Sequence, residues 1–379
     1  MNRLVRSSPE IPDKSLLLIR IDFIGDYILF RNFIQALRDD PQYGGYRFSF
    51  LGNSFWRDLF EKLDGQLFDE VIWLDLAKFE RNPFYRFKKL RQVTSQGYEV
   101  VLSPVYSRDF WNIDSMVKLI SAKEKIGSQG NHSNISRWHK KLSDKYYTKL
   151  IPATQEVLFE FHRNQEFFQG LLKQGIQISR PEIQARPVAA DFGLAEDYAV
   201  FFIGGSYKAK KWGLNNFMAV GDYLSDSYGL QIVLCGGPLE QRELRGHPLG
   251  GDGRFINLAG KTSLWELAGV MKTARLMLSN DTMAPHLAAA LGKDKVFVVY
   301  RGTYYGRCIP YPKQISDGVH VICHPEIQRD PLAYKQASNA YGYVNQLDIN
   351  RITPERVIDE IDEVLRHQAR AGERKRYVA

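Results

Sequence analysis

The pattern of residues 276–300 constrains the fold of this chain more than any other stretch. Residues 276–278 are a short apolar segment, a polar turn then opens an Ala-rich stretch that stops at Gly292, and residues 296–300 are a second apolar segment. Two short apolar segments around a helical stretch predict one βαβ unit. A unit of this kind indicates an α/β fold with a parallel sheet.

The turn of this unit is a candidate anion site. Asn280, Asp281 and Thr282 are candidate N-caps, and Pro285 is suited to the first helical turn. A helix N-terminus at the carboxyl edge of a parallel sheet presents unpaired N–H groups and the positive end of the helix dipole, which favours phosphate. Capping alone also explains Asp281, and His286 is equally suited to a structural role inside the helix, so both interpretations stay open.

A second strand, turn and helix lie near the N-terminus. Residues 16–21 are apolar except for Arg20, and Gly25-Asp26 opens a segment with apolar residues at helical spacing. Two interpretations suit Asp26. It is either a first-turn carboxylate stabilised by the helix dipole, or a carboxylate exposed at the sheet edge that takes a proton from an attacking hydroxyl.

Two loops in the second half have chemistry that suits a nucleotide. The apolar segment 198–203 runs into two glycines, a hydroxyl and a cluster of lysines over residues 204–212. Close backbone approach, a hydrogen-bond donor and positive charge are what a pyrophosphate needs, although lysine-rich loops are also common on surfaces. The next strand, residues 230–234, precedes Glu240, which is either a first-turn helix acid or a carboxylate that binds ribose hydroxyls.

Strand and helix segments alternate through both halves of the chain, which predicts parallel sheets with helices on both faces. An extended stretch at residues 179–193 separates the halves. We expect an N-terminal domain of residues 1–185, a C-terminal domain of residues 186–352, and a C-terminal helix with a basic tail at residues 353–379. The Gly, Asn and Lys content of residues 123–147 predicts a long loop or a loop and helix in the N-terminal domain.

The net charge of +8 is concentrated in the N-terminal half. Residues 78–91 carry six Lys or Arg against one Glu, interleaved with aromatic side chains, and residues 118–149 carry eight Lys or Arg against two acids. Such a surface suits a phosphorylated lipid, an anionic membrane face or nucleic acid, and a solvated face without a partner is the alternative.

Other signals are absent from the sequence. The first fourteen residues are polar and no apolar run approaches a membrane span, so we expect a cytoplasmic protein that does not cross the bilayer. Cys235, Cys308 and Cys323 lack metal-ligand spacing. Because no strand-flanked Asp-x-Asp, P-loop or Gly-x-Gly-x-x-Gly occurs, we expect neither a metal nor a cofactor.

Two motifs carry a resemblance to a known family. Residues 280–292, Asn-Asp-Thr-x-x-x-His-Leu-Ala-Ala-Ala-Leu-Gly, resemble the C-terminal signature of glycosyltransferase family 9, the lipopolysaccharide heptosyltransferases. Residues 17–29 resemble the opening motif of the same family. The resemblance implies a GT-B fold, in which two Rossmann-like domains have parallel sheets facing a central cleft, with the nucleotide sugar on the C-terminal domain and the acceptor on the N-terminal domain.

The resemblance also implies residue roles. Asp26 would be the general base that deprotonates the acceptor hydroxyl, Ser206 and Lys210 would contact the donor phosphates, and Glu240 would bind the ribose. The full donor-binding set that it implies is Ser206, Lys210, Lys211, Glu240, Thr262, Asp281, Thr282, Met283 and His286. Met283 is a departure, because the family usually has glycine there; a side chain at this position demands a wider approach of the phosphate or a different donor.

The function expected from the resemblance is inverting, metal-independent transfer of a sugar, first of all heptose from ADP-heptose, to a lipopolysaccharide core or related surface glycan. The alternatives are a GT-B enzyme using another nucleotide sugar, a nucleotide-sugar epimerase, which needs no acceptor surface, and a non-catalytic module that binds an anionic ligand. The expected partners are a nucleotide-sugar donor and an anionic glycolipid or glycan acceptor, with no nucleic acid. Peripheral contact with the inner face of the cytoplasmic membrane is a hypothesis from charge alone.

Overall fold

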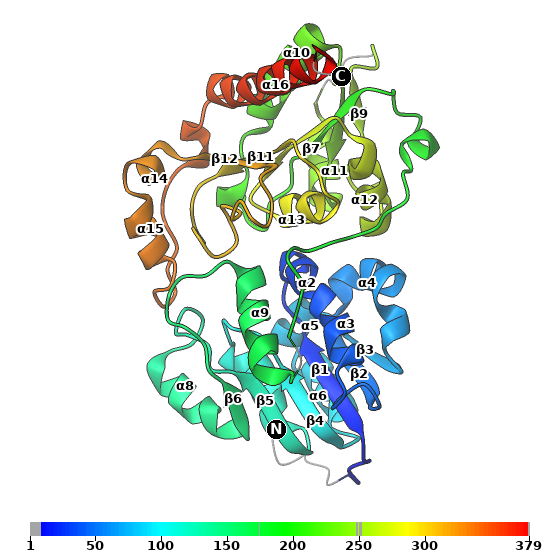
Figure 1. The fold of residues 1–379 in the computed structure, drawn as a ribbon, viewed down its shortest axis with the longest axis vertical. Helices are drawn as coiled ribbons and strands as arrows, with labels where there is room; N and C mark the ends of the chain where they lie inside the picture. Colours follow the sequence, from blue (N-terminus) through cyan, green and yellow to red (C-terminus); the bar gives the residue numbers. More distant parts are fainter. Residues whose placement is uncertain (1–8, 174, 248, 250–251, 378–379) are drawn as a thin grey trace. The chain divides into compact units, whose positions relative to one another are not determined.

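The chain folds into two compact units. The computed structural model describes residues 9–173, 175–247, 249 and 252–377, with side chains described up to residue 367. Unit 1 comprises Met1–Pro181 and Lys335–Val344, and unit 2 comprises Glu182–Tyr334 and Asn345–Ala379 (Figure 1). Each unit is built around its own parallel sheet, so each is described by itself.

Unit 1 contains a six-stranded sheet in the order β3-β2-β1-β4-β5-β6, with every pair of neighbours parallel. Its strands are β1 (Ser15–Arg20), β2 (Arg47–Asn53), β3 (Glu70–Leu74), β4 (Tyr98–Ser103), β5 (Ala122–Ser128) and β6 (Lys149–Ile151). Its helices are α2 (Ile24–Phe30), α3 (Asn32–Asp39), α4 (Arg57–Leu63), α5 (Leu76–Arg81), α6 (Pro83–Val93), α7 (Ser115–Leu119), α8 (Arg137–Ser143) and α9 (Glu160–Leu171).

Helices cover both faces of this sheet, as the strand pattern predicts. Leu17 and Ile19 of β1 belong to the core formed with α6 and α7. On the other side, α2 and α3 pack against α9, where the ring of Phe33 lies 5.2 Å from that of Phe161. Because alternate strand residues point to opposite faces, a strand enclosed in this way reads as a continuous apolar run.

The prediction for residues 123–147 is wrong in part. Residues 122–128 form β5, which pairs with β4 and β6 inside the sheet. Lys123 and Glu124 are exposed, and only the last three residues of β5 are buried. The strand was missed because its first half has no apolar face, and its place is set by pairing with its neighbours.

Unit 2 has a six-stranded parallel sheet in the order β12-β11-β10-β7-β8-β9. Its strands are β7 (Tyr198–Phe202), β8 (Gln231–Cys235), β9 (Phe255–Asn257), β10 (Leu276–Asn280), β11 (Val296–Tyr300) and β12 (Val319–Cys323). Its helices are α10 (Leu214–Tyr228), α11 (Pro238–Leu244), α12 (Leu264–Thr273), α13 (Met283–Ala290), α14 (Pro325–Arg329), α15 (Pro331–Ala337, whose last residues belong to unit 1) and α16 (Pro354–Tyr377). The predicted βαβ unit is confirmed as β10, α13 and β11.

The strand order reverses once in each sheet. In unit 1 the chain moves from β1 to β2 and β3, then crosses back to β4 on the other side of β1. In unit 2 it moves from β7 to β8 and β9, then crosses back to β10. At such a point the loops leaving the two neighbouring strands diverge, which leaves room for a ligand at the carboxyl edge of the sheet.

The described helices include none that is long and apolar enough to span a membrane.

Trp212 joins the loop after β7 to the core of unit 2, and it gives a test of this arrangement. Its side chain is 2% exposed, its indole N–H donates to the Ile352 carbonyl at 2.7 Å, and its ring lies 5.1 Å from that of Phe217. Trp212→Ala should lower the free energy of unfolding by about 3–5 kcal/mol, measured by urea denaturation, because it empties a packed site. Trp138→Ala is the matched control: its side chain is 68% exposed, so a change within about 0.5 kcal/mol is expected. Equal effects of both variants would contradict the packing described here.

Candidate active site

The loop after β7 and the turn after β10 meet in a buried ion pair. The ammonium Nζ of Lys210 lies 2.7 Å from the carboxylate Oδ2 of Asp281, and both side chains are buried. Burial disfavours the charged ammonium, but the Asp281 carboxylate outweighs this effect and raises the pKa of Lys210 above its ordinary value. Lys210 is therefore a cation, held at the point where the strand order of unit 2 reverses.

Aromatic rings and a buried arginine fix this lysine. Its Nζ lies 5.0 Å from the ring centre of Tyr304 and 5.7 Å from that of Tyr207, within the range of cation–π attraction. Arg301, 2% exposed, donates from Nη1 to the Ala209 carbonyl at 2.9 Å and from Nε to Asn345 Oδ1 at 3.0 Å. Arg301 was not among the predicted site residues, although a charged residue directly after a fully apolar strand was a usable signal.

Asn280 connects the two loops beneath the ion pair. It is fully buried at the end of β10, and its Nδ2 donates to the carbonyls of Ile203 and Gly204 at 3.1 and 3.0 Å. Its Oδ1 accepts the Trp212 backbone N–H at 2.9 Å. These three hydrogen bonds all hold the loop after β7, so Asn280 acts as a scaffold residue.

Lys211 and Glu240 form a separate pair. The Lys211 Nζ lies 2.9 Å from Glu240 Oε1 and 2.6 Å from Glu243 Oε1. The other oxygen of Glu240 accepts the backbone N–H of Gly237 at 2.9 Å, at the start of α11. The two adjacent lysines thus contact different acids, and Lys211 lies with the candidate ribose carboxylate rather than with Asp281.

The first turn of α13 places the next three predicted residues. Thr282 is the N-cap, and its hydroxyl accepts the Ala284 N–H at 3.2 Å, while the half-buried Met283 begins the helix. His286 is 5% exposed, and its Nδ1 lies 2.7 Å from the Tyr311 hydroxyl. Burial lowers the pKa of His286 to about 4, so the imidazole is neutral at pH 7.

The remaining predicted donor residues lie on two turns. Ser206 is exposed on the loop after β7, and Thr262 is half-buried directly before Ser263, the N-cap of α12. The backbone N–H of Gly260 donates to the Gly236 carbonyl at 2.9 Å, which connects the turn after β9 to the turn after β8. These turns, like the ion pair, follow strands of the same parallel sheet.

In unit 1, Asp26 lies in the first turn of α2, half-buried, beside a buried cluster of charges. Arg20 is fully buried at the end of β1; its Nε lies 2.8 Å from Asp22 Oδ2, and its Nη2 lies 3.2 Å from Glu160 Oε1 and 3.4 Å from the Asp26 carbonyl oxygen. Burial raises the pKa of Asp22 to about 8; Arg20 opposes the shift, and the charges of Asp26 and Glu160 add to it. Asp22 and Glu160 were missed by sequence reasoning.

Little in the sequence indicates that Asp22 and Glu160 contact Arg20. Glu160 is on α9, far along the chain from Arg20, so only the packing of α9 onto α2 brings them together. The single charged residue in an otherwise apolar strand was the only sign that Arg20 needed buried partners.

Within the described part of the chain, no group of three or more His, Cys, Asp or Glu is arranged to hold a metal ion.

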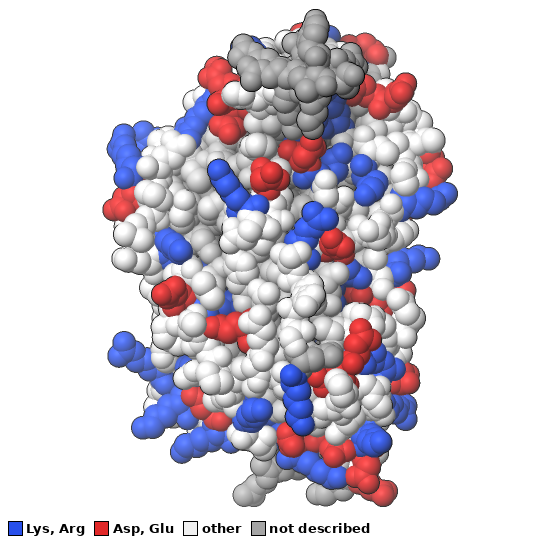
Figure 2. Space-filling model, viewed as in Figure 1, with Lys and Arg blue, Asp and Glu red and all other residues white. Residues whose placement is uncertain are grey.

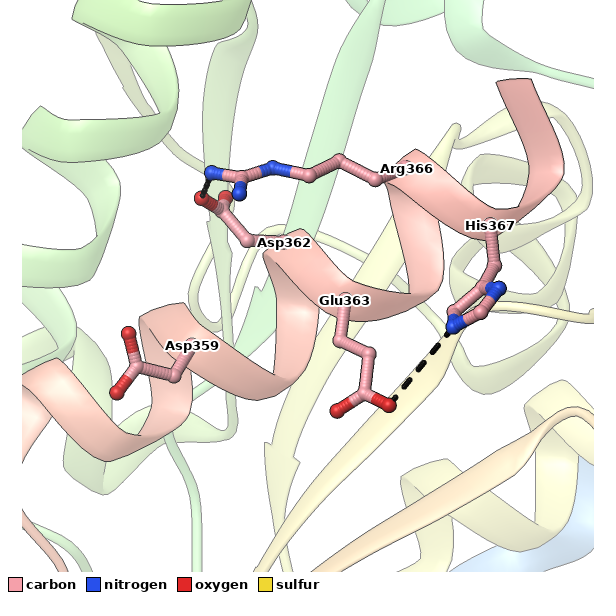
Figure 3. Close-up of a pocket in the computed structure, with 5 residues that line it drawn as sticks. All are labelled: Asp359, Asp362, Glu363, Arg366 and His367. Atoms are coloured by element: carbon pink, nitrogen blue, oxygen red, sulfur yellow. Dashed lines mark hydrogen bonds and ion pairs between the residues drawn. The ribbon is translucent and has the colours of Figure 1, made fainter. Parts of the chain in front are cut away.

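A hollow on α16 is lined by Asp359, Asp362, Glu363, Arg366 and His367 (Figure 3). Asp362 accepts hydrogen bonds from the hydroxyls of Tyr223 and Tyr228 on α10, both at 2.8 Å, and pairs with Arg366 at 2.6 Å. These contacts hold α16 on α10. The hollow lies on a helix that contributes none of the predicted site residues.

The fold of this chain is similar to that of solved glycosyltransferases. A glycosyltransferase family 9 protein from Veillonella parvula superimposes with a TM-score of 0.69 at 17% identity, covering 94% of this chain and 99% of that one. The E. coli heptosyltransferase WaaC, solved with ADP-2-deoxy-2-fluoro heptose, superimposes with a TM-score of 0.62 at 19% identity, covering 92% and 99%. Two parallel Rossmann-like sheets with these neighbours confirm the predicted GT-B glycosyltransferase fold.

The sequence itself gives the family. Residues 86–335 match the model of glycosyltransferase family 9 (heptosyltransferase), and the chain belongs to this family. A lipooligosaccharide heptosyltransferase 2 of Haemophilus ducreyi is 29% identical over 162 residues, which span 41% of this chain and 44% of that protein. The family resemblance is therefore confirmed; the matched range includes the motif at residues 280–292, whereas the motif at residues 17–29 lies before it.

The buried pair predicts a strong energetic coupling. Lys210→Met should destabilise unit 2 by about 3–5 kcal/mol, because it leaves the Asp281 carboxylate buried without a partner. Asp281→Asn should have a similar effect through Lys210, and the double variant should recover much of the loss. The measurement is a double-mutant cycle from urea unfolding at pH 7, and additive effects of the two substitutions would contradict the pairing.

His286 predicts a pH dependence of stability. Its pKa of about 4 lies below the ordinary 6.5, so the unfolded chain takes up this proton first as the pH falls. Burial of the neutral imidazole therefore adds to the free energy of unfolding in full above pH 6.5. This stabilisation is lost between pH 6.5 and 4, by up to about 3 kcal/mol. The stability difference between wild type and His286→Gln should therefore shrink across this window. The half-exposed His320→Gln is the control, and a constant difference for His286→Gln would refute the assignment.

Proposed function

We propose that this protein transfers heptose from ADP-heptose to a lipopolysaccharide core or a related surface glycan, with inversion at the anomeric carbon and without a metal ion. The observation that carries the proposal is the buried Lys210–Asp281 pair at the reversal point of unit 2, directly before α13, in a chain of glycosyltransferase family 9. The relatives bearing heptosyltransferase names, one with an ADP-heptose analogue bound, support heptose and adenine.

The donor diphosphate would be neutralised by groups already in place. Lys210 is a cation between two tyrosine rings, and α13 begins at the same edge of the sheet, so an incoming phosphate meets an ammonium and a helix N-terminus together. These groups stabilise the negative charge that develops on the leaving diphosphate. Ser206 is exposed on the same loop, and Asp281 would orient the sugar.

Asp26 would act as the general base for the acceptor hydroxyl. Its carboxylate, in the first turn of α2 after β1, would take the proton from the acceptor hydroxyl as that oxygen attacks the anomeric carbon from the face opposite the diphosphate. A single direct displacement inverts the configuration. Asp26 lies beside the acids Asp22 and Glu160, both of which contact Arg20; burial raises the pKa of Asp22, and the charges of Asp26 and Glu160 add to that shift.

The acceptor and the location follow from the same proposal. A lipopolysaccharide core is an anionic glycolipid, and the Lys- and Arg-rich segments of unit 1 suit it. We place the reaction at the cytoplasmic face of the membrane, with the protein in peripheral contact. The Ser206, Glu240, Thr262, Thr282, Met283 and His286 assignments to the donor belong to this proposal and are tested with it.

The deciding experiment is a thermal-shift titration with ADP, GDP, UDP and dTDP and their sugars, including ADP-heptose, with and without EDTA. A ligand that binds only the folded protein raises the midpoint by mass action. Selective stabilisation by ADP and ADP-heptose, unchanged by EDTA, supports the proposal. A preference for another base would retain the glycosyltransferase and replace the donor, and no response would overturn nucleotide-sugar binding.

Asp26→Asn should lower kcat by about 100- to 10,000-fold, because it removes the general base, while the thermal shift given by ADP stays as in wild type. The matched control is Asp58→Asn, since Asp58 is also a first-turn acid, on α4 of the same unit. Rates are measured by ADP release with an acceptor glycolipid present. Full activity of Asp26→Asn would exclude this residue as the base.

A further inference from the structure

We propose that an aromatic cluster on unit 1 is a contact surface for an anionic lipid bilayer. The cluster consists of Phe84, Phe110, Trp111, Trp138 and His139, and is called the indole face below. The inference rests on the proposed function, because an enzyme acting on a glycolipid acceptor must work at the surface in which the lipid is embedded. It adds the residues that would make the contact, three of which are large, exposed aromatic side chains.

The indole face gathers side chains from different parts of the chain. Trp111 is 65% exposed and Trp138 is 68% exposed. His139 lies between them, with ring centres 5.7 Å from Trp111 and 5.0 Å from Trp138, and the ring of Phe110 lies 4.3 Å from His139. Phe84, 87% exposed, begins α6, whose Arg86 donates to the Trp111 carbonyl and to Ser115 Oγ. Exposed indoles grouped in this way are a patch rather than isolated surface residues.

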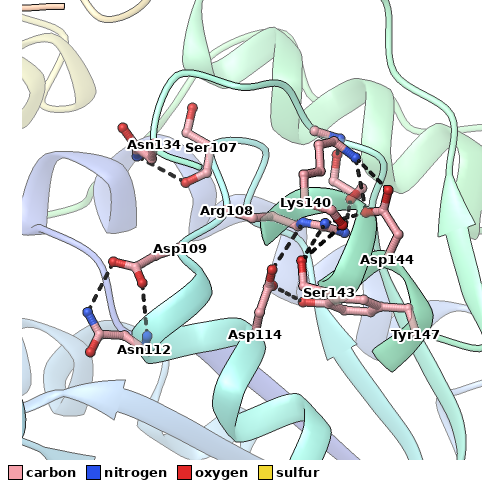
Figure 4. Close-up of polar contacts among 12 residues, drawn as sticks. Ser107, Arg108, Asp109, Asn112, Asp114, Asn134, Lys140, Ser143, Asp144 and Tyr147 are labelled. Carbon is pink, nitrogen blue, oxygen red and sulfur yellow. Dashed lines mark hydrogen bonds and ion pairs between the residues drawn. The ribbon is translucent and has the colours of Figure 1, made fainter. Parts of the chain in front are cut away.

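A buried polar network holds these rings in place (Figure 4). Arg108, 1% exposed, donates to Ser143 Oγ at 3.2 Å and to the Ser128 carbonyl at 3.3 Å, and it pairs with Asp144. The Tyr147 hydroxyl donates to Asp114 Oδ1 at 2.7 Å. These contacts join α8, which carries Trp138, to the π-helical turn Phe110–Asp114, which carries Trp111. The indoles are therefore exposed on a fixed scaffold.

Exposed cations lie on α6 and α8, the helices that contribute Phe84 and Trp138 to the indole face. Arg137 and Lys141 lie on α8 beside Trp138, and Lys88 lies on α6; all three are exposed, and none forms an ion pair with another described residue. Three acids lie near these residues: Asp109 caps the π-helical turn, Glu80 accepts a hydrogen bond from Asn112 Nδ2 at 3.0 Å, and Asp144 binds Arg108 and Lys140. Figure 2 shows Lys and Arg side chains gathered over the α8 region of unit 1.

This combination favours a bilayer over other partners. Indole rings concentrate at the level of the lipid headgroups, where the apolar ring is buried and the N–H stays in contact with water. Lys and Arg near the surface are attracted by anionic headgroups. No described helix spans a membrane, so the contact would be peripheral, as for proteins whose binding combines buried apolar area with electrostatic attraction.

The test is vesicle flotation of the full chain with phosphatidylcholine alone and with phosphatidylcholine containing phosphatidylglycerol and cardiolipin. Wild type should float with the anionic vesicles only. Trp111→Ala/Trp138→Ala should weaken the partition by roughly tenfold or more through lost apolar contact, and Arg137→Glu/Lys141→Glu by at least as much through lost attraction. Tyr341→Ala, 63% exposed in the same unit, and Lys62→Glu, exposed on α4, are the controls and should float as wild type does.

Each outcome decides the inference separately from the proposed function. All variants are first shown to keep the wild-type melting temperature and the wild-type thermal shift with ADP, so that a loss of flotation reports the surface alone. Flotation of the indole variant equal to wild type, equal binding to neutral vesicles, or no binding to any vesicle would overturn the proposal, as would binding of an oligonucleotide without binding of vesicles. Vesicle binding without any nucleotide response would refute the proposed donor and leave the indole face standing.

Discussion

The buried contact between Lys210 and Asp281 is the interaction on which the described site depends. An ammonium and a carboxylate removed from water are stable only as a close pair, so the loop after β7 and the turn after β10 must stay together. Asn280 and Arg301 hold the same part of the chain by donating hydrogen bonds to the backbone carbonyls of Ile203 and Ala209. Under the proposed function, the pair would also hold a cation at the sheet edge, where a phosphate could replace the carboxylate or share the ammonium with it.

Unit 1 also buries a cluster of charges at its strand-order reversal, but there acids outnumber the cation. At its own reversal point the buried cation is Arg20, surrounded by Asp22 and Glu160, with Asp26 nearby. Acids outnumber the arginine there, so the cluster is suited to holding or taking up a proton, whereas the Lys210 site is suited to anions. Under the proposed function, the two sheets would supply the two kinds of chemistry that glycosyl transfer needs, a base and a cationic site for the leaving group.

The sequence predicted most of the strands and helices discussed above, but it did not predict which charged side chains contact one another. Residues 276–300 predicted β10, α13 and β11 because apolar strands and an Ala-rich helix leave clear local patterns. The local pattern does not distinguish Lys210 from Lys211, and only the family resemblance singled out Lys210; the fold directs Lys210 to Asp281 and Lys211 to Glu240. The sequence missed β5 because that strand begins with exposed charged residues, and Glu160 because α9 is distant in the chain from Arg20.

The sequence by itself determined the α/β class, the repeated strand, turn and helix, and the family, because these follow from short-range periodicity and from motifs contiguous in the chain. Tertiary structure alone decided which charges are buried together, that burial lowers the pKa of His286, and that Trp111 and Trp138 share one exposed face. The physical reason is that burial and pairing depend on distances between segments far apart in sequence. Such distances are set by strand order and helix packing, which no local pattern encodes.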